Sequence, residues 1–173
     1  PSPVSADGLL FVTSGFRGNA LKAIRLAGAK GDLAGSPAVV WSYDRDTPYV
    51  PSPLLYGGVL YFLKHNTGIL SALDAATGKV HYGPARVDGI EGVYASPVAA
   101  AGRVYVVGRN GATAVLAAGR ELKVLAVNRL DDGFEASPAI VGREIYLRGR
   151  SHLYAIAEAP APAVKKVAGS PGR

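Results

Sequence analysis

A ten-residue stretch indicates the fold of this chain: SPLLYGGVLY, residues 52–61. A Ser-Pro dipeptide opens the stretch, and an aromatic residue, Tyr61, stands eight positions after the proline. Between them, a Gly-Gly pair separates two short apolar runs, which is typical of two β-strands joined by a tight turn. The stretch therefore predicts the first two strands of a β-sheet.

The same pattern occurs four times along the chain. Ser-Pro begins at residues 2, 52, 96 and 137, and eight positions after each proline stands an aromatic: Phe11, Tyr61, Tyr105 and Tyr146. A glycine lies between proline and aromatic in every copy, at positions 8, 58, 102 and 142. Repeats of roughly 40–50 residues are those of four-stranded propeller blades. A further Ser36-Pro37 has nothing downstream that fits the pattern.

Each repeat is interpreted as strands separated by turns. A second apolar motif follows the aromatic at residues 21–24, 70–73 and 153–156, with a weaker copy at 113–116. In the third repeat the predicted strands are 97–101, 103–107, 112–117 and 121–127, with a turn at Arg109-Asn110-Gly111. The second strands are nearly continuous apolar runs, whereas a half-exposed strand would alternate. Sheets covered on both faces are expected, as in blades packed around an axis.

The predicted fold is all-β: a β-propeller fragment of about four blades, each a four-stranded antiparallel sheet. The blades are assigned to residues 1–51, 52–95, 96–136 and 137–158, and the last is incomplete because it holds three strands at most. Residues 159–173, rich in Ala, Pro and Lys, are predicted to be a disordered tail. A helical fold is excluded because the apolar runs are short and broken by glycine. A β-sandwich remains possible but would not require a repeat.

The composition limits the classes of partner that the chain is expected to bind. The net charge is +6, with basic residues scattered among acids up to Glu158, whereas a nucleic-acid binder usually shows a basic stripe. No apolar run reaches the ~20 residues of a membrane helix. We therefore expect no nucleic acid and no membrane insertion. Cysteine is absent, which excludes disulfides, and methionine is absent even at position 1, so a processed product or fragment is expected.

The segment ALDAATGKVHY, residues 72–82, resembles the tryptophan-docking motif of quinoprotein propellers, Ala-x-Asp-x-x-Thr-Gly-Lys-x-x-Trp, with Tyr82 where that family has Trp. Asp74 and Thr77 can hydrogen-bond the turn backbone, and Gly78 can supply a left-handed residue. The aromatic then packs between neighbouring blades. Trp41 is expected to fill this place in the first repeat, and Leu125 in the third.

The resemblance to pyrroloquinoline-quinone-like repeat proteins covers nearly all of the chain to Glu158, and it is closer to the C-terminal half of large non-enzymatic bacterial members. It implies export to the periplasm or cell surface and a non-catalytic binding or scaffold module that contacts other proteins. The same repeat also serves enzymes, so part of a quinone-dependent or sugar-active propeller enzyme is the alternative. The quinone enzymes carry adjacent cysteines, which this chain lacks.

Neither a cofactor site nor a metal site nor a catalytic residue is predicted. The three histidines, His65, His81 and His152, show no metal-ligand spacing, and no carboxylate–asparagine cluster indicates calcium. His81 is expected to pack in a strand. No Gly-x-Ser-x-Gly or P-loop pattern is present. The acid pairs of residues 44–46 and 131–132 are interpreted as solvated turn residues.

One set of loop residues is expected to lie on a single face of the propeller. In a propeller the fourth-to-first and second-to-third connections open on the same face, and aromatics among mixed charges are typical of protein-binding surfaces. The alternative is that Tyr94 and Phe134 only pack against the next blade. The candidate binding face comprises Tyr49, His65, Asn66, Glu91, Tyr94, Arg109, Asn110, Phe134, Glu135, Arg148, Arg150 and His152, with Asp46 and Lys64 beside them.

The chain is not expected to close a ring by itself. Each blade buries its faces only against neighbours, so the first and fourth repeats each leave an apolar face bare. The fourth repeat also lacks an outer strand, which leaves an open sheet edge. The expected partners are therefore the remaining blades of a larger propeller or, for this chain alone, a second copy in a dimer of half-rings.

Overall fold

The computed structural model describes residues 1–158, which form four successive antiparallel sheets without any helix. The all-β propeller architecture of about four blades is confirmed, with four strands in each of the first three sheets and three in the last. In every sheet the strands are hydrogen-bonded in chain order. With no helix in this range, none is long and apolar enough to cross a membrane. The predicted tail, residues 159–173, lies outside the described residues.

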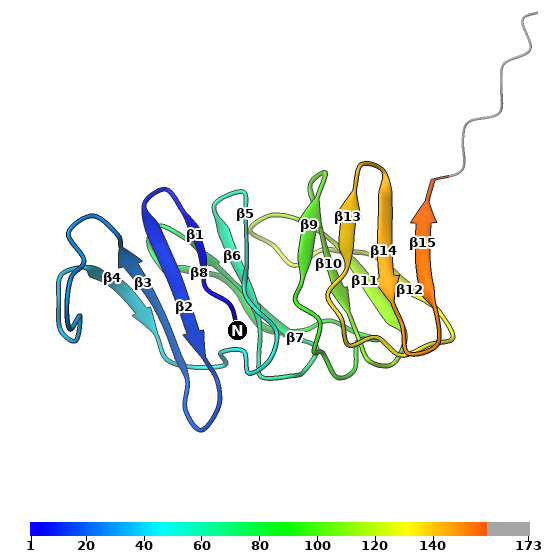
Figure 1. The fold of residues 1–173 in the computed structure, drawn as a ribbon, viewed down its shortest axis with the longest axis horizontal. Coiled ribbons are helices and arrows are strands. Elements are labelled where there is room, and N and C mark those ends of the chain that lie inside the picture. The colour runs from blue at the N-terminus through cyan, green and yellow to red at the C-terminus, as the bar shows by residue number, and fades with distance from the viewer. Residues whose placement is uncertain (159–173) are drawn as a thin grey trace, which may run out of the picture.

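The strands follow the repeat (Figure 1). Blade 1 contains β1 (Val4–Ala6), β2 (Leu9–Ser14), β3 (Ala20–Arg25) and β4 (Val39–Tyr43). Blade 2 contains β5 (Leu54–Tyr56), β6 (Val59–Leu63), β7 (Ile69–Asp74) and β8 (Val80–Arg86). Blade 3 contains β9 (Val98–Ala100), β10 (Arg103–Val107), β11 (Ala112–Ala117) and β12 (Val124–Arg129). Blade 4 contains β13 (Ala139–Val141), β14 (Glu144–Arg148) and β15 (Leu153–Ala157).

Two details of the third repeat differ from the prediction. The fourth strand, β12, starts at Val124 rather than at 121. Leu122 lies in the preceding turn, where its side chain packs against the core between blades 2 and 3. The residue in the position of the docking aromatic is Ala126 rather than Leu125. The register pairs Val115 with Ala126, as it pairs Ala23 with Trp41 and Ala72 with Tyr82. The turn between β11 and β12 is one residue longer than the turn between β7 and β8, which moves this pairing by one position, whereas the bulge beside the pair recurs in all three four-stranded blades.

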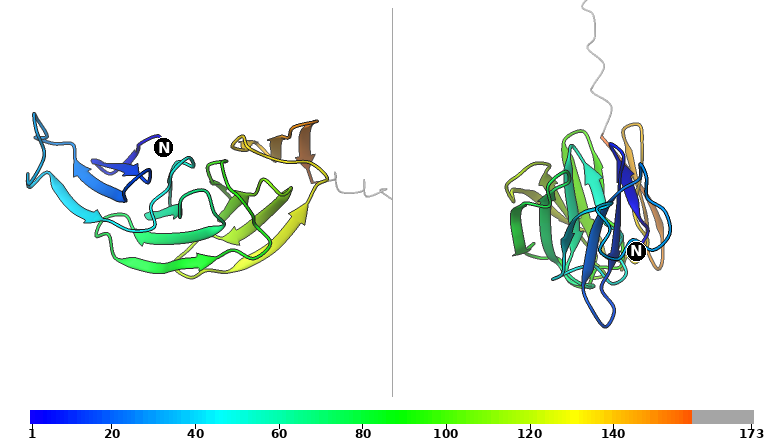
Figure 2. Two further views of the ribbon diagram at one scale, coloured as in Figure 1. Left: turned by 90° about the horizontal axis from the view of Figure 1, so that it is seen from below. Right: turned by 90° about the vertical axis from the view of Figure 1, so that its left-hand side faces the viewer.

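The core lies between blades rather than within a single one. Phe11 and Ala23 of blade 1 are buried against Leu60 and Phe62 of blade 2. On the other side of the same sheet, Tyr61 faces Val104 and Val106 of blade 3. Alternate residues of one strand therefore fill two different interfaces, which is why β6 is buried along its whole length. Figure 2 shows the result, an open arc of sheets with blade 1 at one end and blade 4 at the other.

The turn between β7 and β8 docks blade 1 onto blade 2, as the sequence motif predicts. The Asp74 carboxylate accepts hydrogen bonds from the Thr77 amide, 2.9 Å, and the Thr77 hydroxyl, 2.8 Å, and Gly78 has a φ of +73°. The indole of Trp41 donates to the Ala75 carbonyl over 3.0 Å and covers Gly78, whose added Cβ would lie 2.7 Å from the ring. Trp41 and Tyr82 are both partly buried, Trp41 at the contact of blades 1 and 2 and Tyr82 at that of blades 2 and 3.

Candidate functional site

One face of the arc is formed by two kinds of loop. We call it the rim: the turns between second and third strands, residues 15–19, 64–68, 108–111 and 149–152, and the loops between blades, residues 44–53, 87–97 and 130–138. In blades 2, 3 and 4 each turn is hydrogen-bonded to the loop that precedes its blade, and in blade 1 the Asn19 side chain accepts from the Thr47 amide of the loop that follows, 3.2 Å. The His65 amide donates to Thr47 O, 3.1 Å, the Arg109 amide to Gly92 O, 2.7 Å, and the Arg150 amide to Gly133 O, 3.0 Å. The rim is thus a continuous, internally bonded surface.

Two of the predicted site residues hold the rim together. The Asn66 side chain accepts a hydrogen bond from the Val50 amide, 3.1 Å. The Asn110 side chain accepts from the Glu91 amide, 3.4 Å, and donates to Gly89 O, 2.9 Å. Their amide groups are therefore engaged with backbone, as is usual for asparagine in turns. The same turns approach the loops so closely that a Cβ on Gly111, φ +81°, would lie 2.4 Å from Leu130 O.

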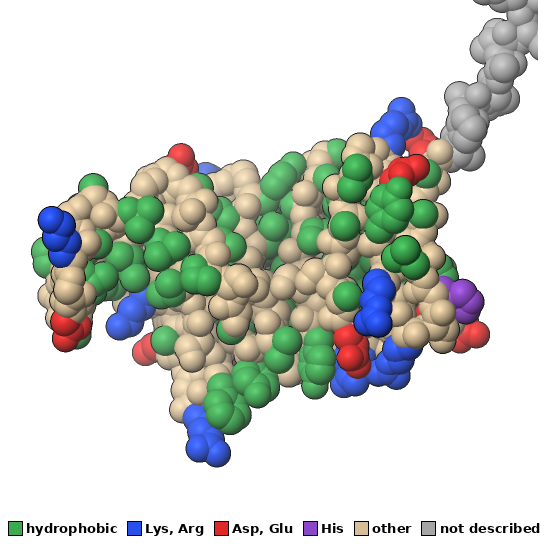
Figure 3. All heavy atoms as spheres, in the orientation of Figure 1, with side chains coloured by type: hydrophobic (Ala, Val, Ile, Leu, Met, Phe, Trp, Pro, Cys, Tyr) green, Lys and Arg blue, Asp and Glu red, His purple; other side chains and the backbone are tan. Residues whose placement is uncertain are grey.

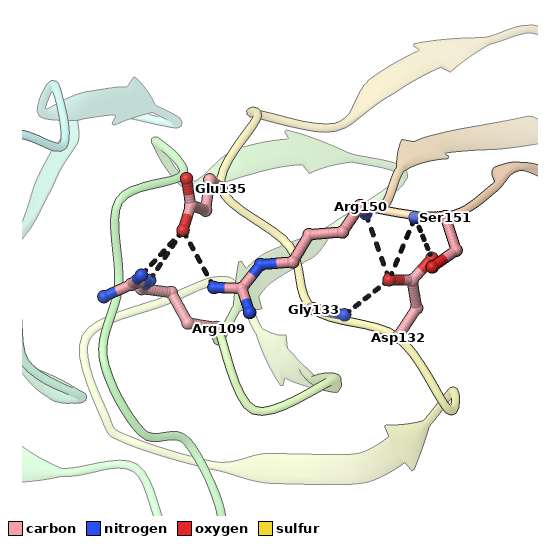
Figure 4. Close-up of polar contacts among 6 residues, drawn as sticks. All are labelled: Arg109, Asp132, Gly133, Glu135, Arg150 and Ser151. Atoms are coloured by element: carbon pink, nitrogen blue, oxygen red, sulfur yellow. Dashed lines mark hydrogen bonds and ion pairs between the residues drawn. The ribbon is translucent and has the colours of Figure 1, made fainter.

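In blade 4 an aspartate performs this joining task. The Asp132 carboxylate, only 2% exposed, accepts from the backbone amides of Gly133, Arg150 and Ser151 (Figure 4). It also accepts from the His152 amide and the Tyr154 hydroxyl. Burial opposes ionisation, but these amide bonds outweigh it and lower the pKa of Asp132. The sequence interpretation of Asp131-Asp132 as solvated turn residues is therefore wrong for Asp132, whose neighbours enclose it.

The C-terminal half of the rim carries a cluster of charges. A single oxygen of Glu135 accepts from Arg109, 2.7 and 3.0 Å, and from Arg150, 3.0 Å (Figure 4). The hydrogen bonds from the two arginine side chains lower the pKa of Glu135, and the bond from Arg150 has the larger effect. The Arg109 guanidinium also lies 4.5 Å from the centroid of the Tyr94 ring. Two guanidinium groups share one carboxylate, so this cluster has an excess positive charge and all three charged side chains remain partly exposed.

The N-terminal half of the rim carries exposed aromatics instead. Tyr49 and Phe16 stack with centroids 5.1 Å apart and are 42% and 59% exposed, and the Arg17 guanidinium lies 5.2 Å from the Phe16 centroid. Val50 beside them is also exposed. Phe16 was missed by the sequence analysis, although an aromatic within Gly15-Phe16-Arg17-Gly18 is a signal for an exposed turn residue. Figure 3 shows hydrophobic side chains at the lower edge below the N-terminal sheets and mixed charges farther toward the C-terminal end.

Most of the remaining predicted residues lie on the surface of the rim or contribute only their backbone to it. Lys64 pairs with Asp46 at 2.8 Å, and Glu91 is exposed. His65, with a φ of +49°, contributes its backbone to a bridge with Pro48. His152 is exposed, with its ring 3.8 Å from Asp132. The structure brings together Tyr94, Arg109, Glu135 and Arg150, and separately places Tyr49 beside Phe16.

Two predicted site residues lie elsewhere. Phe134 is fully buried with Val107 and Leu147 between blades 3 and 4, so the packing alternative holds for it and it is not part of the exposed surface. Arg148 is the last residue of β14 and pairs with Leu153 across the sheet, on the side of blade 4 that faces away from blade 3. Within residues 1–158, no group of three or more His, Asp or Glu side chains is arranged to hold a metal ion.

Comparison with solved structures supports the same fold. The computationally designed Ika4 protein superposes with a TM-score of 0.64 at 8% identity, over 91% of this chain and 89% of Ika4. The N-terminal domain of Nup159 gives 0.59 at 13% identity, over 92% of this chain and 45% of that domain. The quinohemoprotein alcohol dehydrogenase from Comamonas testosteroni gives 0.59 at 17% identity, over 84% of this chain and 28% of that enzyme.

These identities show the fold alone, and the chain spans less than half of the last two proteins. No curated protein matches the chain. The family model described as outer membrane protein assembly factor BamB matches residues 1–160, which include the whole propeller arc. That match agrees with the four repeated Ser-Pro units and with the docking turn at Asp74–Gly78. The chain therefore belongs to this family of PQQ-like β-propeller proteins.

Proposed function

We propose that this chain is a non-catalytic protein-binding module and that the rim is its binding surface. The observation that carries the proposal is the pair of exposed clusters on a hydrogen-bonded rim: Phe16 with Tyr49, and Arg109 with Glu135 and Arg150. Tyrosine, phenylalanine and arginine are enriched at protein interfaces, and tyrosine and arginine among the residues that dominate binding energy.

The rim suits this task because its side chains are held before a partner arrives. Binding usually costs free energy to order loops and long side chains. Here the loops are already bonded to the turns, and both arginines of the charged cluster are already fixed by Glu135. A partner therefore meets an ordered surface and loses less of its binding energy to ordering the loops.

The chemistry of the rim indicates the kind of segment it would bind. The stacked rings of Phe16 and Tyr49 offer an apolar contact, and the charged cluster offers two guanidinium groups against one carboxylate. A polypeptide segment with an apolar side chain and a carboxylate fits both clusters. The proposed partner is thus a protein that presents such a segment.

The family description supports a location for this module. The matched family is named for assembly of outer membrane proteins, so we place the chain outside the cytoplasm of a bacterium, in the periplasm or at the cell surface. A scaffold role in that compartment agrees with a binding rim. The likeness to the alcohol dehydrogenase concerns the fold alone, so part of a quinone-dependent or sugar-active enzyme stays the alternative prediction.

Site-specific photo-crosslinking in cells tests the proposal. A photoreactive amino acid is placed at Phe16 or at Arg150 on the rim, and at Arg143 on the opposite face as the matched exposed control. We expect one protein to be captured from both rim positions and not from position 143. Purified, it should bind the chain at least ~10-fold more weakly after Tyr49→Ala or Arg150→Ala, as for an interface anchor. Equal capture from all three positions, or unchanged binding by both variants, overturns the proposal.

A further inference from the structure

The four Ser-Pro serines form a ladder of hydrogen bonds that runs from blade to blade. The Ser2 amide donates to the Ser52 hydroxyl, 2.8 Å, the Ser52 amide to the Ser96 hydroxyl, 2.9 Å, and the Ser96 amide to the Ser137 hydroxyl, 2.9 Å. Every bond has the same direction, from the amide of one blade to the hydroxyl of the next. The dipeptide that marks the repeat in the sequence is thus also the contact that links successive blades.

The ladder has two different ends. Among residues 1–158, the Ser137 amide at one end has no acceptor and the Ser2 hydroxyl at the other end has no donor. A donor end and an acceptor end complement each other, whereas two copies of the same end do not. The group that continues the ladder beyond blade 4 must therefore offer a hydroxyl in the position of Ser2, and the group that precedes blade 1 must offer an amide in the position of Ser137.

The sheet faces at the two ends repeat the internal interfaces. On blade 1, Leu10 and Val12 point away from blade 2, at the positions where Leu60 and Phe62 are buried against blade 1. On blade 4, Tyr146 occupies the position of Phe11 and Tyr61, which are buried against the following blade. Beside it, Val141 is 61% and Leu153 71% exposed. Each end therefore presents apolar side chains at positions that internal blades bury, although on blade 4 Arg148 stands where blade 2 has the buried Leu63.

Charge also distinguishes the ends. Lys22 is paired across the sheet with Val12, on the open side of blade 1. Glu144 is paired with Val141 on the open side of blade 4, where Arg148 also lies. A blade 1 face meeting another blade 1 face would bring lysines together, whereas the blade 4 face carries one carboxylate, Glu144, and one guanidinium, Arg148. The charges therefore disfavour contact between two blade 1 faces, and the ladder favours contact of unlike ends.

We propose that a second copy of this chain occupies both ends, so that two arcs close head to tail. The blade 1 face of each copy packs on the blade 4 face of the other, and the Ser137 amide of each donates to the Ser2 hydroxyl of the other.

The mass of the full 173-residue chain in solution is the first test, measured by light scattering and sedimentation across micromolar concentrations. Head-to-tail closure predicts a species of twice the 17.8 kDa chain mass that does not grow further. A monomer at all concentrations overturns the proposal, and so does an open series of larger oligomers, because it would show that the arc does not close.

Variants on the two faces test the orientation. Leu10→Asp on blade 1 and Leu153→Asp on blade 4 should each weaken association by roughly 10- to 100-fold, because a charge replaces a buried apolar side chain. Leu26→Asp, in an exposed turn of blade 1, is the control and should have no effect. Circular dichroism checks that all three remain folded. Unchanged association of both face variants contradicts the proposed contact.

Mixing the two face variants separates head-to-tail from like-end contact. The intact blade 4 face of Leu10→Asp and the intact blade 1 face of Leu153→Asp can still meet, so the mixture should form a dimer that neither variant forms alone. Contact between like ends would instead leave one of the two variants fully dimeric by itself. Ser2→Ala should weaken association by about 2- to 10-fold. Ser36→Ala, a Ser-Pro serine outside the ladder, should not.

Discussion

Blades 2 and 4 carry the same repeat but differ in burial. Both have Ser-Pro, a tight turn and an aromatic eight residues after the proline, and their second and third strands pair in the same register. In β6 of blade 2 all five residues are buried, whereas in β14 of blade 4 only Leu147 is. The sequence pattern thus specifies the sheet, but the neighbouring blade decides which of its side chains are buried.

The repeated aromatic shows this difference most clearly. Tyr61 in blade 2 is fully buried, and its hydroxyl accepts from the Gly119 amide of blade 3, 2.8 Å, and donates to Gly119 O, 3.3 Å. Tyr146 in blade 4 uses its hydroxyl to contact Glu144 of its own strand. The same residue in the same register therefore contributes to an interface in one blade and to a local surface contact in the other.

The largest difference is expected when apolar side chains are removed from the two blades. Phe62→Ala in blade 2 should lower the free energy of unfolding by about 3–5 kcal/mol, because Phe62 fills the contact with blade 1. Tyr146→Ala in blade 4 should leave the unfolding midpoint of the monomer within experimental scatter. Urea denaturation followed by circular dichroism measures both. Equal losses would show that blade 4 is packed as tightly as blade 2.

A second comparison uses turn glycines. Gly78 in blade 2, φ +73°, lies under Trp41, whereas Gly142 in blade 4, φ +59°, has open space around the position of a Cβ. Gly142→Ala should cost about 1–2 kcal/mol for the left-handed backbone alone. Gly78→Ala should cost about 2–4 kcal/mol, because the Trp41 ring must also move. If the two losses measured in denaturant are the same, the docking contact of Trp41 contributes nothing.

Removing one hydroxyl gives a smaller and more specific effect. Tyr61→Phe deletes both contacts with Gly119 and should destabilise the chain by about 0.5–1.5 kcal/mol. Tyr146→Phe, the matched change in blade 4, should have no measurable effect on unfolding of the monomer. A Tyr61→Phe variant as stable as the parent chain would mean that the hydrogen bonds to Gly119 make no net contribution to the free energy of unfolding.

The last effect, a change in how stability depends on pH, is expected from Asp132, which holds the turn of blade 4. Its pKa is lowered in the folded chain, so the ionised carboxylate stabilises the fold above its unfolded pKa of about 3.8. That contribution should be lost as the pH falls below about 4 and through the lower folded pKa. Asp132→Asn should therefore flatten the loss of stability in acid, whereas Asp131→Asn should not. Thermal melts from about pH 2 to about pH 7 measure this loss of stability. Parallel curves for both variants contradict it.

Much of the fold was predictable from local sequence. Strands and turns depend on residues a few positions apart, so Arg103–Val107 and Ala112–Ala117 were predicted with the bounds that the structure has. The docking turn was predictable for the same reason, since Asp74, Thr77 and Gly78 contact one another within a single turn. The pairing of Ala126 was not, because the turn before β12 is one residue longer than the turn before β8 and no local pattern marks the extra residue.

The candidate site was predictable only in part. The sequence placed Tyr49, Tyr94, Arg109, Glu135 and Arg150 on loops of one face, because loop position follows from strand order. It did not show that Asn66, Asn110 and Asp132 are engaged in joining loops. Nor did it separate the buried Phe134 from the exposed Phe16.

The sequence by itself determined the number of blades, most of the strands within them and the motif that docks one blade on another. It could do so because these features repeat and arise from contacts close along the chain. Only the tertiary structure decided which copy of a repeated residue is buried, and that the four Ser-Pro serines form one directed ladder. Those contacts join residues from 41 to 50 positions apart, and they exist only once neighbouring blades pack together.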